Sequence, residues 1–232
     1  MGGASRPTHA SMTRVKICGI TNLDDARLAI DAGADALGFI FVEKTPRFMT
    51  PEQVAPIVRW LPPFVTPIGV FWDHPSGHVK AVAEACRLRA LQLHGDEPPE
   101  ELGGYGLPVI KTIKIPPTST LEGLPEYKIS GFIDALKYRA VASALLLDTA
   151  VRWSEGEARE TIAWKRIAMM GGRHDARVNV ILSGGLNPDN VAEAIGIVHP
   201  YAVDVNSGVE ARPGKKDPDK VRRFVQQVRA AA

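Results

Sequence analysis

The sequence predicts a single (β/α)8 barrel, a closed ring of parallel strands with a helix after each strand. Short apolar and β-branched segments recur along the chain, each about as long as a fully buried strand. A stretch of helical character follows most of them, and buried strands that alternate with helices form parallel sheets. Eight such repeats in 232 residues fit one barrel, a fold that typically uses about 250 residues.

The strands are expected where apolar residues follow one another without interruption. They lie at residues 14–18, 36–41, 67–71, 90–94, 109–113, 144–148, 179–183 and 202–206. An open, doubly wound sheet is the alternative arrangement of such units. Its commonest fingerprint, Gly-x-Gly-x-x-Gly after the first strand, is missing, because Cys18 and Gly19 stand at that place. We therefore favour the closed barrel.

Residues that start and stop helices support the same alternation. The first helix begins after Thr21 or Asn22, both good N-caps, and stops at Gly33, a good C-terminal cap. Proline at the favoured first position is expected to open three later helices. These prolines are Pro51, Pro188 and Pro218. The fifth helix, within residues 126–141, is the most weakly marked.

Composition is that of one soluble globular domain. Hydrophobic residues make up 45% of the chain, and 28 basic against 26 acidic residues leave a net charge of +2. This near balance gives no argument for nucleic acid or for an acidic membrane surface as a partner. No apolar run approaches the length that spans a bilayer. Residues 1–13 lack the apolar centre of a secretory signal, so we expect a flexible extension, followed by the barrel at 14–232.

The two cysteines, Cys18 and Cys86, lie far apart and show neither metal-ligand spacing nor a disulfide framework. Free thiols in a reducing compartment are the better interpretation, and this favours a cytoplasmic protein. No histidine has carboxylate or cysteine neighbours at metal-like spacing, so no metal is assigned. The sequence leaves open whether the chain is a monomer or a homodimer.

In a (β/α)8 barrel the active site lies at the carboxyl ends of the strands. Several reactive side chains stand at these ends or in the loops beyond them. They are Cys18, Arg47, His94, Asp148, Ser183, Asp204 and Asn206. The residues are scattered in sequence, yet the fold would gather them at one mouth.

Cys18 closes the first strand. A buried structural cysteine is the usual fate of this residue type, but the place at a strand end beside Gly19 favours a functional role. Positive charge or helix N-termini near the thiol would lower its pKa from about 8.5. The resulting thiolate could abstract a proton from carbon.

Asp148 follows an apolar run directly and is either a helix N-cap or a general acid. Desolvation at a barrel mouth would keep its carboxyl group protonated long enough to donate. Arg47 is either a solvated surface residue or a planar fork for a substrate carboxylate. His94 is either a hydrogen-bonded residue of the mouth or a contact to substrate.

Glycine-bearing loops follow the seventh and eighth strands. The first contains Gly184 and Gly185, and the second contains Asn206, Ser207 and Gly208. Loops at these two positions form the recurrent phosphate site of such barrels, because backbone N–H groups and a helix N-terminus can reach the anion. A pair of tight turns is the plainer interpretation of each loop alone.

Taken in order, these motifs resemble those of phosphoribosylanthranilate isomerase, from Arg14 to the C-terminus. The matching segments are residues 16–21, 34–41, 45–47, 91–95, 147–149, 182–186, 204–210 and 215–217. The resemblance implies a cofactor-free Amadori rearrangement of N-(5-phosphoribosyl)anthranilate in tryptophan biosynthesis. It implies Cys18 as general base, Asp148 as general acid and Arg47 as partner of the anthranilate carboxylate. His94 and Asp204 would line the substrate, and the glycine loops would hold its phosphate.

The chain departs from the family pattern at residues 152–164, where a charged segment replaces the usual Gly-Gly-Thr-Gly loop and Phe-Asp-Trp; only Thr161 and Trp164 echo these motifs. Residues 71–73 are also bulkier than the family pattern. Three alternatives stay open. The chain could be an indole-forming barrel enzyme with Lys111 as its lysine, an isomerase that also accepts the related histidine-pathway substrate, or a non-catalytic barrel that binds a phosphorylated ligand.

Overall fold

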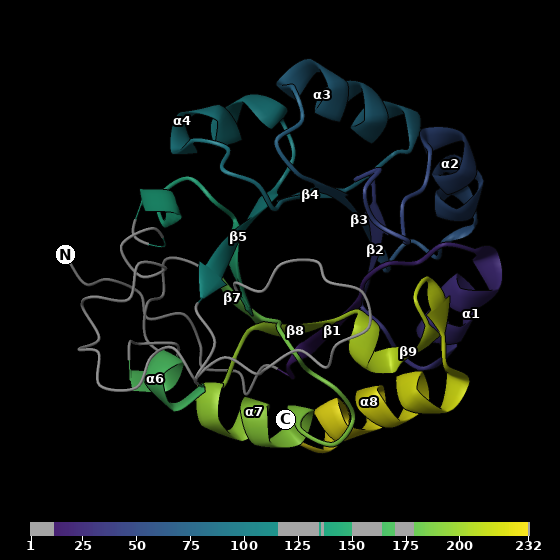
Figure 1. Ribbon diagram of the computed structural model, residues 1–232, viewed down its shortest axis with the longest axis vertical. Helices are drawn as coiled ribbons and strands as arrows, with labels where there is room; N and C mark the ends of the chain where they lie inside the picture. Colours follow the sequence, from purple (N-terminus) through teal and green to yellow (C-terminus); the bar gives the residue numbers. More distant parts are fainter. Residues whose placement is uncertain (1–11, 116–134, 136, 150–163, 170–178, 232) are drawn as a thin grey trace.

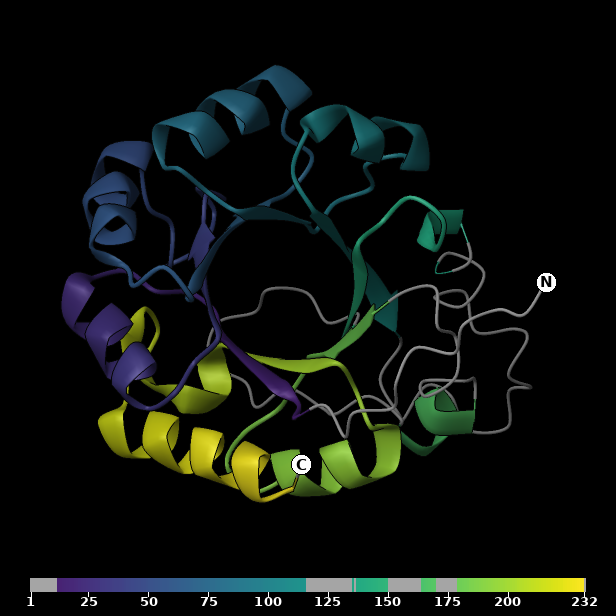
Figure 2. The same cartoon turned by 180° about the vertical axis from the view of Figure 1, so that it is seen from behind.

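Eight parallel strands form a closed barrel inside a ring of helices (Figures 1 and 2). The computed structural model describes residues 12–115, 135, 137–149, 164–169 and 179–231. Each strand pairs with the next in sequence, and the first pairs in parallel with the eighth. This closure confirms the predicted fold class and excludes the open sheet. The extension at residues 1–11 and the charged segment at 152–163 lie outside the described residues.

The barrel strands lie where the apolar segments predicted them. They are β1 (Arg14–Ile17), β2 (Ala36–Ile40), β3 (Thr66–Phe71), β4 (Ala90–Leu93), β5 (Val109–Ile115), β6 (Ala144–Thr149), β7 (Asn179–Leu182) and β8 (Ala202–Val205). A short antiparallel pair, β9 (Glu210–Arg212) and β10 (Lys215–Lys216), was not expected.

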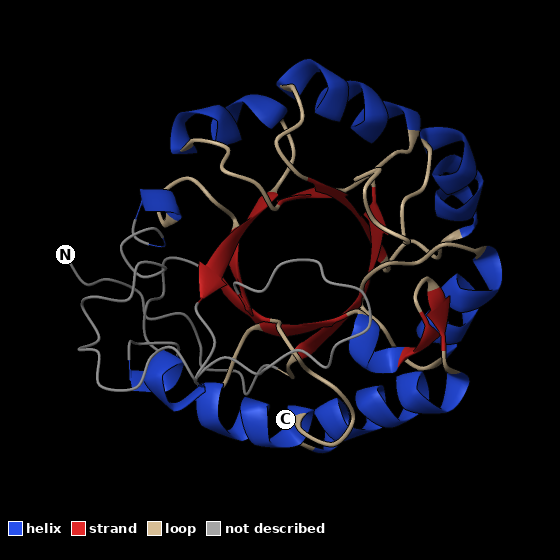
Figure 3. Cartoon of the chain, viewed as in Figure 1, coloured by secondary structure: helices blue, strands red, loops and turns tan. Residues whose placement is uncertain are grey.

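The helices cover the outside of the barrel, as the colouring by secondary structure shows (Figure 3). They are α1 (Leu23–Asp31), α2 (Pro51–Trp60), α3 (Ser76–Ala85), α4 (Pro99–Leu102), η1 (Gly103–Tyr105), α6 (Trp164–Met169), α7 (Val191–Val198), η4 (Ser207–Val209) and α8 (Pro218–Ala230). Within the described residues, no helix is long and apolar enough to cross a membrane.

Local signals fix most helix starts. The side chain of Asn22 accepts a hydrogen bond from the Asp25 N–H at 2.9 Å and so caps α1, as predicted. Pro51 and Pro218 occupy the first turns of α2 and α8. Pro188 does not open α7, which was the expectation. It lies in the turn of residues 188–190, and α7 begins at Val191 with Asn190 as its N-cap.

Five strands end one residue earlier than predicted, so that Cys18, Phe41, His94, Ser183 and Asn206 are the first residues beyond them. The backbone ladder nevertheless continues through most of these positions. The Cys18 N–H donates to the Val205 carbonyl at 2.9 Å, and the His94 N–H donates to the Phe71 carbonyl at 2.8 Å. The Ser183 N–H likewise donates to the Leu147 carbonyl at 2.9 Å. These side chains therefore keep the direction that the strand sets.

Alternation along each strand separates two apolar regions. The larger core lies between strands and helices, and it includes Val15, Ile17, Leu145 and Leu147 of the strands together with the buried faces of the helices. A smaller cluster fills the inside of the barrel. Its members are Ile68, Ala90, Ile110, Ala144, Leu146, Ile181 and Ala202. Because successive side chains of a strand point to opposite faces, the two clusters show which residues face inward.

Candidate active site

The inward-facing side chains at the carboxyl ends of the strands form two groups. The first group comes from β1, β8 and the loops after β2 and β8, and it contains Lys16, Cys18, Arg47, Asp204, Asn206, Glu210 and Lys216. The second comes from the ends of β3 to β6, and it contains Trp72, His94, Lys114 and Asp148. Alternation explains the strand residues of both groups, because Cys18 shares its face with Lys16, and Asp148 shares its face with Leu146.

Cys18 is 4% exposed and packs against Ile40 and Val70 at the top of the barrel interior. Burial raises the pKa of the Cys18 thiol, whereas the neighbouring ammonium groups of Lys16 and Lys216 lower it. The sequence had led us to expect a lowered thiol pKa. The cations are present, but desolvation outweighs them, so the expected direction is wrong.

Lys16 and Asp204 are an ion pair inside the barrel. They are register partners on the adjacent strands β1 and β8, and Lys16 Nζ lies 2.8 Å from Asp204 Oδ1. The two side chains are only 3% and 6% exposed. Burial lowers the pKa of Lys16, but Asp204 and Cys18 more than offset this, and the net direction is upward. Lys16 therefore keeps its charge beside the thiol.

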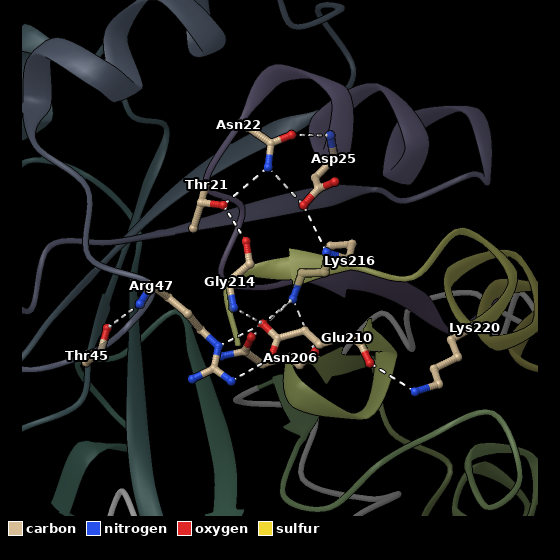
Figure 4. A network of polar contacts seen from close by, with 10 residues as sticks. All are labelled: Thr21, Asn22, Asp25, Thr45, Arg47, Asn206, Glu210, Gly214, Lys216 and Lys220. Atoms are coloured by element: carbon tan, nitrogen blue, oxygen red, sulfur yellow. Dashed lines mark hydrogen bonds and ion pairs between the residues drawn. The ribbon is translucent and has the colours of Figure 1, made fainter. Parts of the chain in front are cut away.

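Arg47 binds a carboxylate of the chain itself. Its Nε donates to Glu210 Oε1 at 2.8 Å and its Nη2 donates to Oε2 at 2.5 Å (Figure 4). Both residues are buried, so the plain interpretation of a solvated surface arginine is wrong. The contacts of Arg47 within the described part of the chain leave Nη1 without a hydrogen bond.

Glu210 also receives a buried lysine. Lys216 Nζ lies 3.2 Å from Glu210 Oε1 and 3.1 Å from Asn206 Oδ1. Burial raises the pKa of Glu210, but the hydrogen bond from Arg47 and the charge of Lys216 outweigh it, and the pKa is lowered. Burial lowers the pKa of Lys216, and Glu210 only partly offsets the effect.

The β9–β10 pair is held against the start of α1. Thr21 Oγ1 donates to the Gly214 carbonyl at 2.6 Å, and the Lys216 N–H donates to Asp25 Oδ2 at 2.9 Å. These bonds connect residues near the start of the barrel sequence with residues near its end, since Thr21 and Gly214 are 193 positions apart. They fix the backbone of Lys216, and they explain why Asp25 is buried in the first turn of α1.

The second group surrounds Asp148. His94 Nε2 lies 4.0 Å from Asp148 Oδ2, and the indole of Trp72 packs on the His94 imidazole with ring centroids 5.0 Å apart. Lys114 Nζ lies 4.5 Å from the Trp72 ring centroid. The bulky residue after β3, for which the sequence offered no explanation, thus supports the histidine beside the candidate acid.

Lys111 does not face the mouth. Its register partners, Leu93 and Leu145, belong to the outer core, so the alternation turns Lys111 toward the helices. Its Nζ lies 2.7 Å from Glu97 Oε2 and 2.5 Å from the Gly95 carbonyl. This placement removes the feature on which the indole-forming alternative depended.

The glycine loops after β7 and β8 touch each other. Gly184 and Gly185 both have positive φ, and Asn190 Nδ2 donates to the Gly185 carbonyl at 3.0 Å. A Cβ on Gly208 would lie 1.9 Å from the Leu186 carbonyl oxygen, so only glycine permits this approach. Asn206 and Ser207 stand at the start of η4 in the same place. The loops after β7 and β8, which the sequence predicted to share a site, are therefore in contact.

Sequence reasoning missed five residues of the site, among them Lys114 on β5. Lys16, Glu210 and Lys216 lay within quoted motifs without a role, and Trp72 was noted only for its size. A charged residue inside an apolar strand, two positions before a reactive cysteine, was the available signal for Lys16. Among the residues that the structure describes, no three His, Cys, Asp or Glu side chains come together as metal ligands would.

Fold and site together define a (β/α)8-barrel enzyme, with acid–base side chains and adjoining glycine loops at the carboxyl mouth. The family model of N-(5'-phosphoribosyl)anthranilate (PRA) isomerase matches residues 15–227. The chain belongs to this family.

Relatives and solved structures agree over nearly the whole length. The N-(5'-phosphoribosyl)anthranilate isomerase of Pelobacter propionicus is 46% identical over 215 residues, which are 93% of this chain and 95% of the relative. The phosphoribosylanthranilate isomerase structure from Thermotoga maritima is 39% identical with a TM-score of 0.81, and it covers 94% of this chain and 100% of its own. A complex of such an isomerase with reduced 1-(o-carboxyphenylamino)-1-deoxyribulose 5-phosphate has 39% identity, the same coverage and a TM-score of 0.79.

Proposed function

We propose that this chain converts N-(5-phosphoribosyl)anthranilate into 1-(o-carboxyphenylamino)-1-deoxyribulose 5-phosphate in tryptophan biosynthesis, with Cys18 as base and Asp148 as acid. The observation that carries the proposal is the mouth itself, where an inward thiol on one side and an inward carboxyl on another accompany the glycine loops of β7 and β8. Family membership supports the same reaction.

The acid opens the sugar ring. Asp148 donates its proton to the ring oxygen, which becomes the C4′ hydroxyl, while the bond to C1′ breaks and an iminium forms with the anilino nitrogen. His94, 4.0 Å from Asp148 and supported by Trp72, orients the carboxyl group. The aspartate is only 6% exposed at the mouth of the barrel.

The base completes the isomerisation. The Cys18 thiolate takes the C2′ proton, and the electron pair of that bond forms the C1′–C2′ double bond as the iminium nitrogen becomes neutral. The enolamine then tautomerises to the ketone, with one proton added at C1′ and one lost from the C2′ hydroxyl. Exchange with solvent returns Cys18 to thiolate and Asp148 to acid, so protons balance over the cycle.

Binding groups flank these two residues. Gly184, Gly185, Ser207 and Gly208 present backbone N–H groups to the phosphate, together with the side chain of Asn206. Arg47 offers Nη1 to the anthranilate carboxylate while Glu210 holds the other edge of the guanidinium.

Lys16 occupies Oδ1 of Asp204, which leaves Oδ2 to line the substrate. The proposal includes a cytoplasmic location and an oligomeric state of either monomer or homodimer. The non-catalytic alternative rested on the charged segment at residues 152–163, and family membership favours the enzyme over it.

Turnover of freshly generated phosphoribosylanthranilate by the purified chain tests the function, followed as the loss of anthranilate-type fluorescence. We expect turnover without added metal or cofactor. A folded protein without turnover would overturn the proposal. The related histidine-pathway substrate, assayed in parallel, measures the breadth of the site.

A further inference from the structure

Lys16 contacts the candidate base from inside the barrel. It stands two residues before Cys18 on β1, so both side chains face inward and Lys16 lies one layer deeper. Its ammonium group lies 2.8 Å from Asp204 Oδ1, and its charge acts on the neighbouring Cys18 thiol. Because its side chain is only 3% exposed, Lys16 acts below the floor of the mouth.

Gly38 on β2 leaves room for this contact. A Cβ at Gly38 would lie 2.7 Å from Cys18 Sγ and 3.1 Å from Lys16 Nζ. The sulfur and the nitrogen therefore both border the same space beside the backbone of β2, which a larger residue at position 38 would crowd.

We propose that Lys16 is a positioning residue for the isomerisation: Asp204 fixes its ammonium group beside Cys18, and the positive charge stabilises the thiolate. The inference rests on the proposed role of Cys18 as the base. It adds a residue that acts through Cys18 and touches no substrate atom.

The charges around Cys18 explain why such a residue is needed. Burial raises the pKa of the thiol, and the Asp204 carboxylate raises it further by repelling the thiolate. The ammonium groups of Lys16 and of Lys216, on β10, lower it. Lys16 is ion-paired with Asp204 and so offsets the repulsion between that carboxylate and the thiolate.

Lys16 stays protonated throughout the proposed reaction. When Cys18 takes the C2′ proton, the thiolate becomes a neutral thiol, and Lys16 keeps its proton and its bond to Asp204. When the thiol returns its proton to solvent, the ammonium again faces two negative groups. Lys16 neither gives nor takes a proton, which agrees with its raised pKa.

Replacement of either Lys16 or Asp204 distinguishes a positioning role of Lys16 from a purely structural role. In a Cys86→Ser background, Cys18 is the one thiol of the chain, and the thiolate absorbance can be titrated against a Cys18→Ser reference. Lys16→Met should raise the apparent pKa of Cys18 by about 1 unit or more, as expected for loss of a cation in contact. Asp204→Asn should lower it, because the repelling carboxylate is gone and the ammonium remains.

Lys111→Met is the matched control, since it removes another buried lysine with a carboxylate partner, on the outer face of β5. It should leave the titration of Cys18 unchanged. In turnover, Lys16→Met should move the ascending limb of kcat/KM to higher pH. Shifts in the same direction for Lys16→Met and Asp204→Asn, or no shift in either, would overturn the inference.

Asp204→Asn alone decides the question if Lys16→Met does not fold: a fall in the thiol pKa supports the inference, and a rise or no change contradicts it. The titration needs no substrate. Failure of the proposed function would appear differently, as no turnover by the folded wild-type chain, whereas full turnover by Cys18→Ser would disprove only the role of Cys18 as base.

Discussion

The guanidinium of Arg47 and the carboxylate of Glu210 are joined by two hydrogen bonds, although 163 residues separate them in sequence. The pair brings the loop after β2 against the segment after β8 at the rim of the site. The pair holds the guanidinium in one orientation and leaves Nη1 free, among the described residues, to bind a ligand. A solvent-exposed arginine would lose more side-chain entropy when it bound the same ligand.

Arg47→Ala should mainly raise KM. Loss of a hydrogen bond to a charged group is worth about 1.5–3 kcal/mol, so an increase of roughly 10-fold or more is expected. Steady-state kinetics measure it, with the exposed Arg59→Ala as control. An unchanged KM would remove Arg47 from the binding site.

Glu210 should make stability fall in acid. Its pKa is lowered in the folded protein, chiefly by Arg47 and Lys216 acting against burial, so its contribution is present above the unfolded pKa of about 4.3. The contribution is lost as the pH falls through the lower, folded pKa. Glu210→Gln should cost roughly 3 kcal/mol at neutral pH, since it breaks a buried pair, and should flatten the acid limb. Denaturant unfolding at several pH values checks this, and equal acid slopes would contradict it.

Cys18→Ser and Asp148→Asn should each fold normally and lower kcat by about 10²- to 10⁴-fold, the usual share of a general acid or base. Both replacements nearly conserve volume, so the melting temperature should change little. Cys86→Ser is the matched control: burial raises the pKa of Cys86 to about 11, and it lies outside the site. A variant of Cys18 or Asp148 with near wild-type kcat would disprove the role of that residue.

Trp72→Leu should lower kcat/KM, because His94 loses the ring that supports it beside Asp148. An aromatic pair is worth about 0.5–1.5 kcal/mol, which corresponds to roughly a 2- to 12-fold effect. Trp72→Phe keeps a ring and should retain most of the activity. If leucine and phenylalanine behaved alike, stacking on the histidine would not be the reason.

Gly208→Ala should weaken phosphate binding. The new Cβ would meet the Leu186 carbonyl at 1.9 Å and force the two glycine loops apart. We expect KM and the inhibition constant of inorganic phosphate both to rise about tenfold, or about 1.4 kcal/mol. Gly77→Ala, which adds a methyl group into open space at the start of α3, is the control. Unaltered phosphate inhibition would show that these loops do not bind the anion.

The order of the strands and the residues at their ends could be predicted from the sequence alone. Apolar segments mark β1 to β8 because each strand is covered on both sides, and caps such as Asn22 act within one helical turn. These are local effects of a few neighbouring residues. The positions of Cys18 and Asp148 at the mouth follow from them.

The partners of the site residues could not be predicted, because the tertiary structure alone decides them. Lys16 meets Asp204 across 188 residues, and this requires the closure of β1 onto β8 in one particular register. The outward turn of Lys111 depends likewise on which face of β5 lies inside. A shift of one residue would reverse every such direction, and the sum of desolvation and charge that sets the Cys18 pKa would change with it.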